Sequence, residues 1–411
     1  MAHVAFCIAP FTGHVNPSLA IVSELARRGH RVSYATTAQF AAAAQAAGGQ
    51  VVTYETSAML PPGGRPARHE TTGAELAHAW RGQLRELEAV TPVLVRAFGD
   101  DVPDAVVCDP MSWPGPVLAA RWHVPSVTSV TSMISDARWS LGPVGAKFNP
   151  ADPAFPRLFA AVSAALARYE SGLTADRLLG SDDGTPVIAY YPRAFQRRGD
   201  QFGSHVWFAG PCLPGRPEAV PRAPAGREAR RAQPLVLVSL GTVFNRQPAL
   251  FRRCIDAFAG LDYQVVAALG GMDPAELGPL PGNTSAHAYV PLTQVLPQAA
   301  VLVGHGGMTS TMEALSHGVP IVALPQMPEQ RVNAERLTEL GLGAHLEPAR
   351  QTGPPLRETV AAVLHDAGLR SRLDWMRAEI GRAPGAPAVA EVIENMMRRC
   401  HRGGAGTYAN A

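Results

Sequence analysis

One glycine-rich stretch, residues 301–313 (VLVGHGGMTSTME), has the residue types that could hold an anion. An apolar strand runs into the glycines at 304–307, and a helix is expected to begin directly after them. Glycines let a backbone approach a ligand closely, and the free N–H groups of a helix start favour negative charge. Ser310 could donate to a phosphate oxygen, and Glu313 could accept hydrogen bonds from a ribose diol. The spacing of these residues is equally consistent with two interpretations, a phosphate-binding site and a tight turn that leads into an ordinary capped helix.

A second chemical feature is a histidine that follows the first predicted strand. His14 falls in a loop expected over 10–16, after an apolar strand over 3–9. Such a histidine can act as a general base near neutral pH, although a lone loop histidine more often has a structural role. Asp109 ends another predicted strand, 105–109, and its carboxylate could fix the tautomer of the histidine and stabilise its charged form. Asp109 could instead only cap the helix that follows, and the sequence leaves both roles open.

Other catalytic motifs are absent from the sequence. The first loop, APFTGHVNP, has no GxGxxG fingerprint, and the only lysine, Lys147, follows an alanine, so there is no Walker A loop. No serine lies between glycines at two residues on both sides, and there is no HExxH pair. The formal net charge is +2, from 36 basic and 34 acidic residues. This balance gives no electrostatic case for a nucleic-acid or membrane partner.

Composition narrows the class of protein further. Hydrophobic residues make up 46% of the 411 residues, and no apolar run approaches the roughly 18 residues that span a bilayer. The five cysteines are scattered and show no CxxC spacing, so we expect neither disulfides nor a zinc site. The N-terminus has no basic leader. We therefore expect a soluble, cytoplasmic protein.

The elements that must position these residues alternate between strand and helix. Apolar runs predict buried strands at 3–9, 31–35, 105–109, 126–130, 235–239, 264–269, 285–289, 300–303 and 319–324. The first helix is expected to have Asn16 as its N-cap and Pro17 at its first position. Repeated βα units predict α/β domains with doubly wound parallel sheets. Ligands bind at the carboxyl ends of such strands, which is where the glycine-rich stretch, His14 and Asp109 all fall.

The length of the chain and its double alternation predict two domains. We expect an N-terminal Rossmann-like domain over 1–212, a linker rich in Pro and Arg over 213–233, and a second Rossmann-like domain over 234–385. A C-terminal helix over 386–402 is expected to pack back on the N-terminal domain. The glycine-rich tail over 403–411 is expected to be disordered.

Longer segments of the sequence are recognisable as motifs. They are GHVNPSL at 13–19, RGHRVSYA at 28–35, CDPMSWPGPVL at 108–118, PRAFQRRGD at 192–200, SLGT at 239–242, and YVPLTQVL…GHGGMTSTMEALSHGVPIVALPQMPEQRVNAER over 289–336. In this order, over nearly the whole chain, they resemble the family 1 glycosyltransferases of the GT-B fold. Among these, the chain is similar to the bacterial macrolide glycosyltransferases, such as the oleandomycin glucosyltransferases of Streptomyces. The resemblance implies two Rossmann-like domains that face each other across a cleft.

The resemblance also implies roles for single residues. In this family the first-loop histidine, here His14, removes the proton of the acceptor hydroxyl, and the aspartate, here Asp109, orients that histidine. The acceptor oxygen attacks the anomeric carbon from the face opposite the nucleotide, so the configuration inverts. The implied donor-binding residues are Gly241, Thr242, His305, Gly307 and Ser310 around the diphosphate, Glu313 at the ribose, Tyr289 and Val290 near the base, and Glu329 and Gln330 at the sugar hydroxyls. No metal and no cofactor are implied; the co-substrate is a nucleotide sugar, with UDP-glucose favoured.

The expected acceptor is a small apolar natural product such as a macrolide or a polyphenol. Candidates to line its pocket are apolar or aromatic, and each could equally be core: Phe11, Met59, Trp80, Met111, Trp113, Met133 and Trp139. Tyr289 stands where many relatives have Trp, and Thr309 where plant relatives have Asn, so the base and the sugar stay open. The alternatives are a dTDP-deoxysugar transferase and a non-catalytic helper or binding protein; the His14 and Asp109 pair disfavours a nucleotide-sugar epimerase. We expect a monomer or a homodimer.

Overall fold

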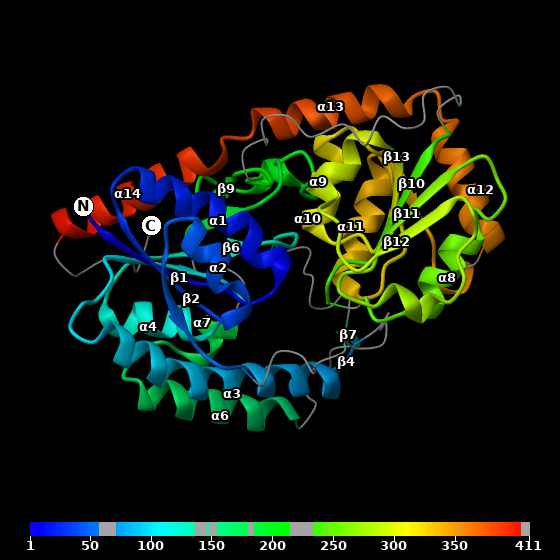
Figure 1. The fold of residues 1–411 in the computed structure, drawn as a ribbon. Coiled ribbons are helices and arrows are strands. Elements are labelled where there is room, and N and C mark those ends of the chain that lie inside the picture. Colours follow the sequence, from blue (N-terminus) through cyan, green and yellow to red (C-terminus); the bar gives the residue numbers. More distant parts are fainter. Residues whose placement is uncertain are drawn as a thin grey trace.

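The structure, a computed structural model, describes residues 1–56, 71–135, 146–147, 154–179, 185–213, 233–243, 245–351 and 353–403. Over these residues the chain forms two parallel sheets flanked by helices (Figure 1). A separate pair of short strands consists of β4 (Thr71–Thr72) and β7 (Ala146–Lys147). Apart from its two end residues, the predicted linker over 213–233 lies outside the described residues.

The N-terminal sheet has seven parallel strands in the order β3-β2-β1-β5-β6-β8-β9. They are β1 (His3–Cys7), β2 (Arg31–Thr36), β3 (Gln50–Thr53), β5 (Ala105–Cys108), β6 (Ser126–Val130), β8 (Val187–Ala189) and β9 (Val206–Phe208). All five residues of β1 are buried, because its side chains enter two different cores in alternation. Val4 and Phe6 pack in one hydrophobic cluster, whereas Ala5 and Cys7 pack in another. Burial on both faces explains why this strand reads as an unbroken apolar run.

The C-terminal sheet has six parallel strands in the order β12-β11-β10-β13-β14-β15. They are β10 (Leu235–Ser239), β11 (Gln264–Ala268), β12 (Thr284–His287), β13 (Ala299–Gly304), β14 (Ile321–Ala323) and β15 (Gly343–His345). In both sheets the chain starts in the middle, builds one side and then returns to build the other. The direction of winding reverses between β1 and β5 in the first sheet and between β10 and β13 in the second. The predicted doubly wound α/β fold is confirmed, and the two reversal points are where such sheets bind ligands.

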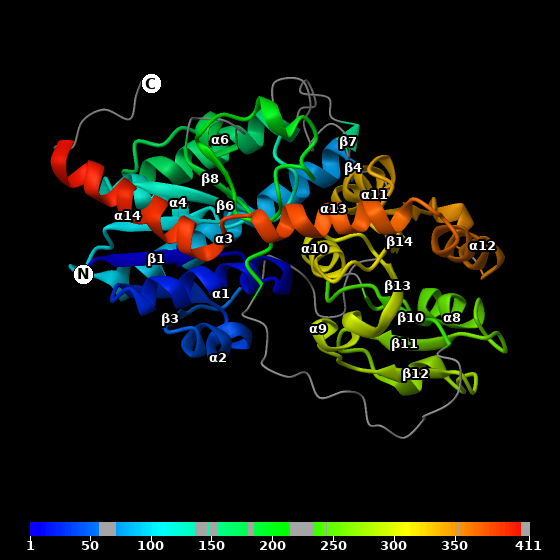
Figure 2. The same cartoon turned by 90° about the horizontal axis from the view of Figure 1, so that it is seen from above.

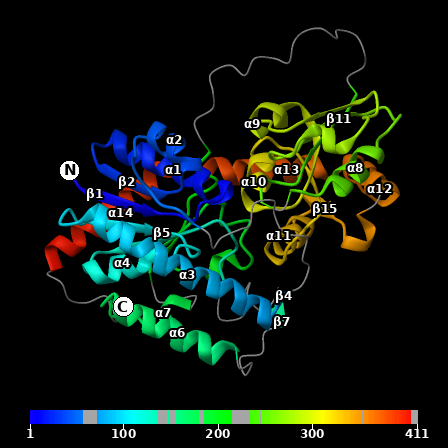
Figure 3. The ribbon, with the colours of Figure 1, turned by 60° about the horizontal axis from the view of Figure 1, so that its bottom comes forward.

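Helices cover both faces of the sheets. The α-helices are α1 (Thr12–Arg27), α2 (Ala38–Ala46), α3 (Gly73–Phe98), α4 (Pro114–Trp122), α6 (Ala154–Arg168), α7 (Ala175–Leu179), α8 (Pro248–Asp256), α9 (Leu292–Val295), α10 (Met308–Ser316), α11 (Pro328–Glu339), α12 (Gly353–Leu364), α13 (Leu369–Arg382) and α14 (Gly385–Gly403). The short 3₁₀ turns are η1 (Gly199–Gln201), η2 (Pro274–Leu277), η3 (Leu296–Gln298) and η4 (Pro348–Arg350). Around the N-terminal sheet, α1, α2 and α14 lie on one face and α3 and α4 on the other, with α6 packed along α3 (Figure 3).

The first helix begins earlier than the sequence predicts. Its N-cap is Phe11, so the loop expected over 10–16 and the cap expected at Asn16 are wrong. His14 therefore lies in the first turn of α1. Pro17 lies inside the helix, where its missing N–H leaves the carbonyl of Gly13 without the usual helical donor. The prediction failed because it rested on the preference of proline for the first helical position. In the structure Pro17 lies inside the helix, and the carbonyl of Gly13 accepts a hydrogen bond from another part of the chain.

The last two helices connect the domains (Figure 2). α13 packs on the C-terminal domain against α10, and α14 lies along α1 of the N-terminal domain. Ile393 and Met397 of α14 are buried in the same cluster as the apolar face of α1. Glu394 pairs with Arg28 at 3.2 Å and with His30 at 3.0 Å. Residues 404–411, which make up nearly all of the predicted disordered tail, lie outside the described residues.

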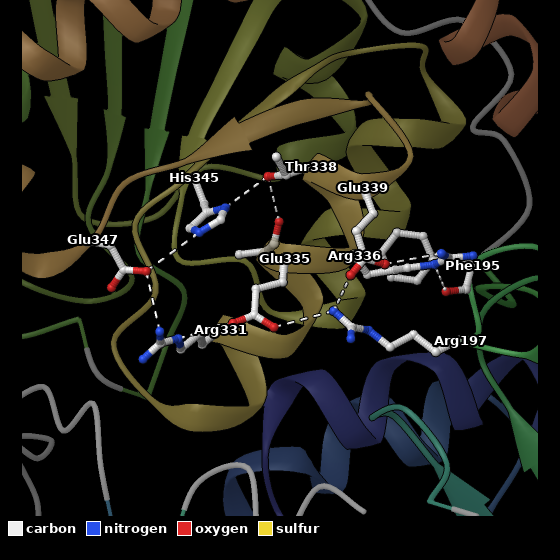
Figure 4. A network of polar contacts seen from close by, with 10 residues as sticks. Phe195, Arg197, Arg331, Glu335, Arg336, Thr338, Glu339, His345 and Glu347 are labelled. Carbon is white, nitrogen blue, oxygen red and sulfur yellow. Dashed lines mark hydrogen bonds and ion pairs between the residues drawn. The ribbon is translucent and has the colours of Figure 1, made fainter. Parts of the chain in front are cut away.

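A second set of contacts ties α11 to the N-terminal domain (Figure 4). Arg336 donates from Nε to the carbonyl of Phe195 and from Nη2 to that of Ala194, both at 3.0 Å. Arg197 reaches back from the N-terminal domain to Glu339, with an N–O distance of 2.6 Å. In the described part of the chain, no helix is both long and apolar enough to cross a membrane.

Candidate active site

The carboxyl ends of β1 and β5 bring the first two predicted residues together. The strands are neighbours, with Cys7 in register with Cys108, so the segments that follow them leave the sheet side by side. His14 Nδ1 lies 2.6 Å from Oδ2 of Asp109, a fully buried carboxylate. Its other oxygen, Oδ1, accepts the N–H of Met111 at 2.8 Å. Asp109 thus holds its own turn and the imidazole together, so the structural and the orienting role coexist.

Competing effects set the ionisation of His14. Burial lowers its pKa, but the charge of Asp109, the hydrogen bond to it and the charge of Glu329 outweigh burial, and the pKa is raised overall. When Nδ1–H donates to Asp109, Nε2 carries the lone pair that can accept a proton. The hydroxyl of Thr131, directly after β6, lies 3.3 Å from Nε2. The ring of His14 is oriented by Asp109, its pKa is raised, and 23% of its side chain is exposed, so an acceptor can reach it. A general base needs all three properties.

A second group of predicted residues lies at the carboxyl ends of β10 and β13. His305 follows β13, and its ring is enclosed by two glycines. A Cβ on Gly241 would lie 2.7 Å from ring Cε1, and a Cβ on Gly307 would lie 2.4 Å from Nε2. Any larger residue at either position would therefore displace the ring. Gly241 also has φ +78°, a conformation that favours glycine.

The environment of His305 keeps its ring neutral near pH 7. Burial lowers its pKa to about 4, against the opposite effect of a backbone hydrogen bond with Ser239. Within the described part of the chain, Nδ1 is buried without a hydrogen-bond partner. The ring is neutral and half-buried, so His305 can serve as a neutral hydrogen-bonding group for a ligand.

The start of α10 supplies further groups beside His305. Gly307 is the N-cap and offers no side-chain cap, so the first N–H groups of the helix can bind an anion. The Ser310 hydroxyl donates to the carbonyl of Gly307 at 3.1 Å, which holds it at the helix start. One turn on, burial raises the pKa of Glu313 to about 7. The Glu313 carboxyl has no hydrogen-bond or ion-pair partner among the described residues.

The start of α11 contributes the other two predicted donor residues. Glu329 accepts a hydrogen bond from Asn333 Nδ2 at 2.6 Å. Burial raises the pKa of Glu329 to about 7, while this hydrogen bond and the charge of His14 act in the opposite direction. Helices α1 and α10 pack against each other, so the two half-sites face each other across the domains. Gln330 is buried, and its Oε1 accepts the N–H of Gln326 at 2.8 Å, which orients the amide.

The remaining donor candidates lie at the same edge of the C-terminal sheet. Thr242 is exposed beside Gly241, after β10. Tyr289 and Val290 follow β12; Tyr289 is 72% exposed and Val290 is half-buried. An aromatic ring this exposed has a free face on which a base could stack.

The structure separates the acceptor candidates into two groups. The Phe11 ring lies 5.6 Å from that of His14, and Met111, which follows the Asp109 turn, is 40% exposed. Both residues lie beside the His14 and Asp109 pair; Phe11 is half-buried and Met111 is exposed.

The other acceptor candidates lie in packed surroundings or cannot be placed. Trp113 and Met133 are only 4% and 3% exposed and belong to hydrophobic clusters. Trp80 is half-buried and packs edge-on against Phe155 at 5.8 Å. The sequence could not distinguish core from lining, because aromatic and methionine side chains suit both. The remaining two candidates, Met59 and Trp139, lie outside the described residues.

Sequence reasoning assigned no contact at the site to three polar residues, although it noted Thr309 as a departure from the family pattern. Thr131 follows β6, and the rule that ligands bind at strand ends could have found it. Asn333 is four residues after Glu329, the spacing that places two side chains on one helical face. Thr309 donates from Oγ1 to the carbonyl of Gly13 at 2.9 Å, a contact between domains that no sequence pattern signals.

Comparisons with known proteins agree with this architecture. The family model described as "Erythromycin biosynthesis protein CIII-like, C-terminal domain" matches residues 252–398. Demethyllactenocin mycarosyltransferase of Streptomyces fradiae is 39% identical over 97% of this chain and 87% of its own length. Oleandomycin glycosyltransferase of Streptomyces antibioticus is 35% identical over 97% of this chain and 92% of its own length.

A solved structure extends the match to the fold. The crystal structure of CalG4, the calicheamicin glycosyltransferase, has a TM-score of 0.80 at 33% identity and covers 97% of this chain and 99% of that chain. Because the match extends over both domains, the chain is a glycosyltransferase of the GT-B fold. The chain belongs to the family 1 glycosyltransferases, in the subgroup of bacterial macrolide glycosyltransferases. The resemblance found in the sequence is confirmed.

Proposed function

We propose that this chain is an inverting, metal-independent glycosyltransferase that moves glucose from UDP-glucose to a hydroxyl of a small apolar natural product, such as a macrolide or a polyphenol. The observation that carries the proposal is the 2.6 Å contact between His14 and Asp109 at the reversal point of the N-terminal sheet. Glu329 of the other domain is close enough to influence His14. A base on one domain and an anion-binding helix start on the other suit transfer between an acceptor and a nucleotide sugar.

In the proposed reaction, His14 acts as the general base. Nε2 takes the proton of the acceptor hydroxyl while Nδ1–H stays bonded to Asp109, whose charge balances the imidazolium. The acceptor oxygen forms its bond to the anomeric carbon as the bond to the diphosphate oxygen breaks on the opposite face. The configuration inverts, and the proton later leaves His14 for solvent.

We propose that the C-terminal domain holds the donor. The diphosphate would lie at the start of α10, where Thr242 and the neutral ring of His305 donate hydrogen bonds. The Ser310 hydroxyl would donate there too, once it turns from the Gly307 carbonyl to the bound phosphate. Glu313 would bind the ribose, and Tyr289 would stack on the base beside Val290. Glu329 and Gln330 would contact the sugar hydroxyls. In this proposal the helix start and His305 stabilise the leaving charge, and no cofactor takes part beyond the nucleotide sugar itself.

A second candidate keeps the fold and changes the donor. The relative that is 39% identical is named for a sugar other than glucose, mycarose. Transfer from a dTDP-deoxysugar is therefore the alternative. A cytoplasmic location and a monomeric or homodimeric state remain predictions.

Mass spectrometry of reaction products tests the donor and the acceptor. UDP-glucose and dTDP-glucose are each incubated with macrolide, flavonoid and phenolic acceptors. We expect a product one hexose heavier from UDP-glucose, with the anomeric configuration inverted by NMR. A retained configuration would contradict the mechanism. Nucleotide binding without any product would contradict UDP-glucose transfer and favour a dTDP-deoxysugar donor or a helper role.

Activity should depend on pH through His14. The base works only when neutral, and its pKa is raised above the usual 6.5, so kcat/KM should rise with pH along a limb above pH 6.5. Asp109→Asn removes the charge that raises this pKa, so the limb should move to lower pH while the plateau rate falls. Glu329→Gln is the matched control. It removes the smallest of the effects that raise the pKa of His14, so the pH limb of kcat/KM should move less than in Asp109→Asn. A limb that stays in place in Asp109→Asn would contradict the pairing.

A further inference from the structure

One hydrogen bond joins the two half-sites directly. Thr309 Oγ1 donates to the backbone carbonyl of Gly13 at 2.9 Å, between residues 296 positions apart in the chain. Gly13 immediately precedes His14 in the first turn of α1, and Thr309 is the second residue of α10. These two helices, one from each domain, pack against each other. The bond therefore lies beside the proposed base on one side and beside the proposed diphosphate site on the other.

The carbonyl of Gly13 is open to this bond because its own helix cannot use it. In an α-helix, the carbonyl of residue 13 accepts the N–H of residue 17. Residue 17 is proline, which has no N–H and whose ring crowds that same carbonyl. The carbonyl of Gly13 therefore has no donor within α1 and accepts the hydroxyl of Thr309 from the other domain.

The two hydroxyls in the first turn of α10 act differently. Ser310 donates to the carbonyl of Gly307 and so stays within its own helix start. Thr309 points away from its helix and crosses to α1. The contact is already close, since a Cβ on Gly13 would lie 3.5 Å from Thr309 Oγ1. Gly307 also encloses the ring of His305, so the crossing hydroxyl follows directly on the segment that positions this ring.

We propose that Thr309 is a positioning residue for His14: its bond to Gly13 fixes the first turn of α1 against the start of α10. This inference rests on the proposed glycosyl transfer and adds a residue to it. The acceptor oxygen and the anomeric carbon must approach to about 3–3.5 Å, and different domains hold them. A small misplacement between reacting groups lowers the rate without weakening binding. Thr309 limits that misplacement at the base.

Removing the hydroxyl should lower turnover and leave nucleotide affinity intact. Thr309→Val should reduce kcat by roughly 2–10-fold, the range of one neutral hydrogen bond, with Kd for UDP within about twofold. The contacts of Arg336 and Arg197 keep the domains docked in this variant. Thr309→Ser retains the donor and should restore most of kcat. Thr359→Val is the control, since it removes a threonine hydroxyl bonded to the Pro355 carbonyl at 2.8 Å in α12 and should not change kcat.

A substitution at Pro17 tests whether Thr309 acts through Gly13. Pro17→Ala returns an N–H that can donate to the Gly13 carbonyl, so this carbonyl no longer depends on Thr309. In that background, Thr309→Val should lower kcat by less than about twofold. An equal loss in both backgrounds would overturn the proposal, because Thr309 would then act by another route.

Hydrogen exchange provides a readout that needs neither donor nor acceptor. Mass spectrometry of a peptide covering the first turn of α1 should show faster exchange in Thr309→Val and wild-type exchange in Thr309→Ser. Unchanged exchange in Thr309→Val would overturn the inference even if kcat falls. If the wild-type chain transfers no sugar, the proposed function fails, and exchange still decides whether Thr309 holds this turn.

Discussion

Replacing His14 with alanine should lower kcat by roughly 10²–10⁴-fold, the contribution of a positioned general base. The imidazole is held by Asp109 at 2.6 Å, and its raised pKa makes it a good proton acceptor once it is neutral. Without it, the acceptor hydroxyl must attack while still protonated or lose its proton to water. The loss should appear in single-turnover transfer, where product release does not contribute.

Nucleotide binding should survive the same substitution. The diphosphate groups proposed above belong to α10 and its preceding loop, so calorimetry of His14→Ala should give a Kd for UDP within about twofold of wild type. His365→Ala, an exposed histidine that follows α12, is the control and should change neither quantity. Turnover by His14→Ala within about tenfold of wild type would rule out the base assignment. Glu329, whose pKa burial raises to about 7, would then be the candidate base, and His14→Ala combined with Glu329→Gln would test it.

Replacing His305 with alanine should affect binding as well as rate. It removes one hydrogen-bonding group from the developing charge, which should lower kcat by roughly 10²–10³-fold. A hydrogen bond to a charged group contributes about 1.5–3 kcal/mol, so the Kd for UDP should rise roughly 10–10²-fold. The physical reason is that the neutral, half-buried ring lies beside the N-cap of α10, where it can donate a hydrogen bond to a bound diphosphate.

Stability must be measured beside this variant. The His305 ring fills the space between Gly241 and Gly307, so its removal leaves a gap, and Tm shows whether the domain still folds. His317→Ala, at the other end of α10, is the matched control and should leave UDP affinity unchanged. Wild-type UDP affinity in a folded His305→Ala protein would contradict the diphosphate assignment. His14→Ala should therefore lower kcat alone, whereas His305→Ala should change both kcat and the Kd for UDP.

Most of the fold was predictable because it depends on local patterns. The apolar run at β1 is buried on both faces of a parallel sheet, so its sequence signal is strong. Strand-end reasoning then located His14, Asp109 and the stretch around His305, since ligands of doubly wound sheets bind there. The start of α1 was missed, because a proline usually opens a helix and only a distant donor to Gly13 makes its interior position tolerable.

The acceptor residues show where sequence patterns stop. Trp113 and Met111 are near neighbours in the sequence and both could line a pocket. One is buried in a cluster around α3 and α6, whereas the other is exposed beside the Asp109 turn. Burial depends on how α3, α4 and α6 pack, and that packing is not encoded in a single segment.

By itself, the sequence determined the two doubly wound sheets, the family, and the strand ends at which the site had to lie. These follow from periodicity and motifs within short segments. Only the tertiary structure decided that His14 meets Asp109, that burial brings Glu313 and Glu329 to a pKa of about 7, and that Thr309 reaches Gly13 across the domains. The physical reason is that distances and burial arise between residues far apart in the chain, and they set the chemistry of the site.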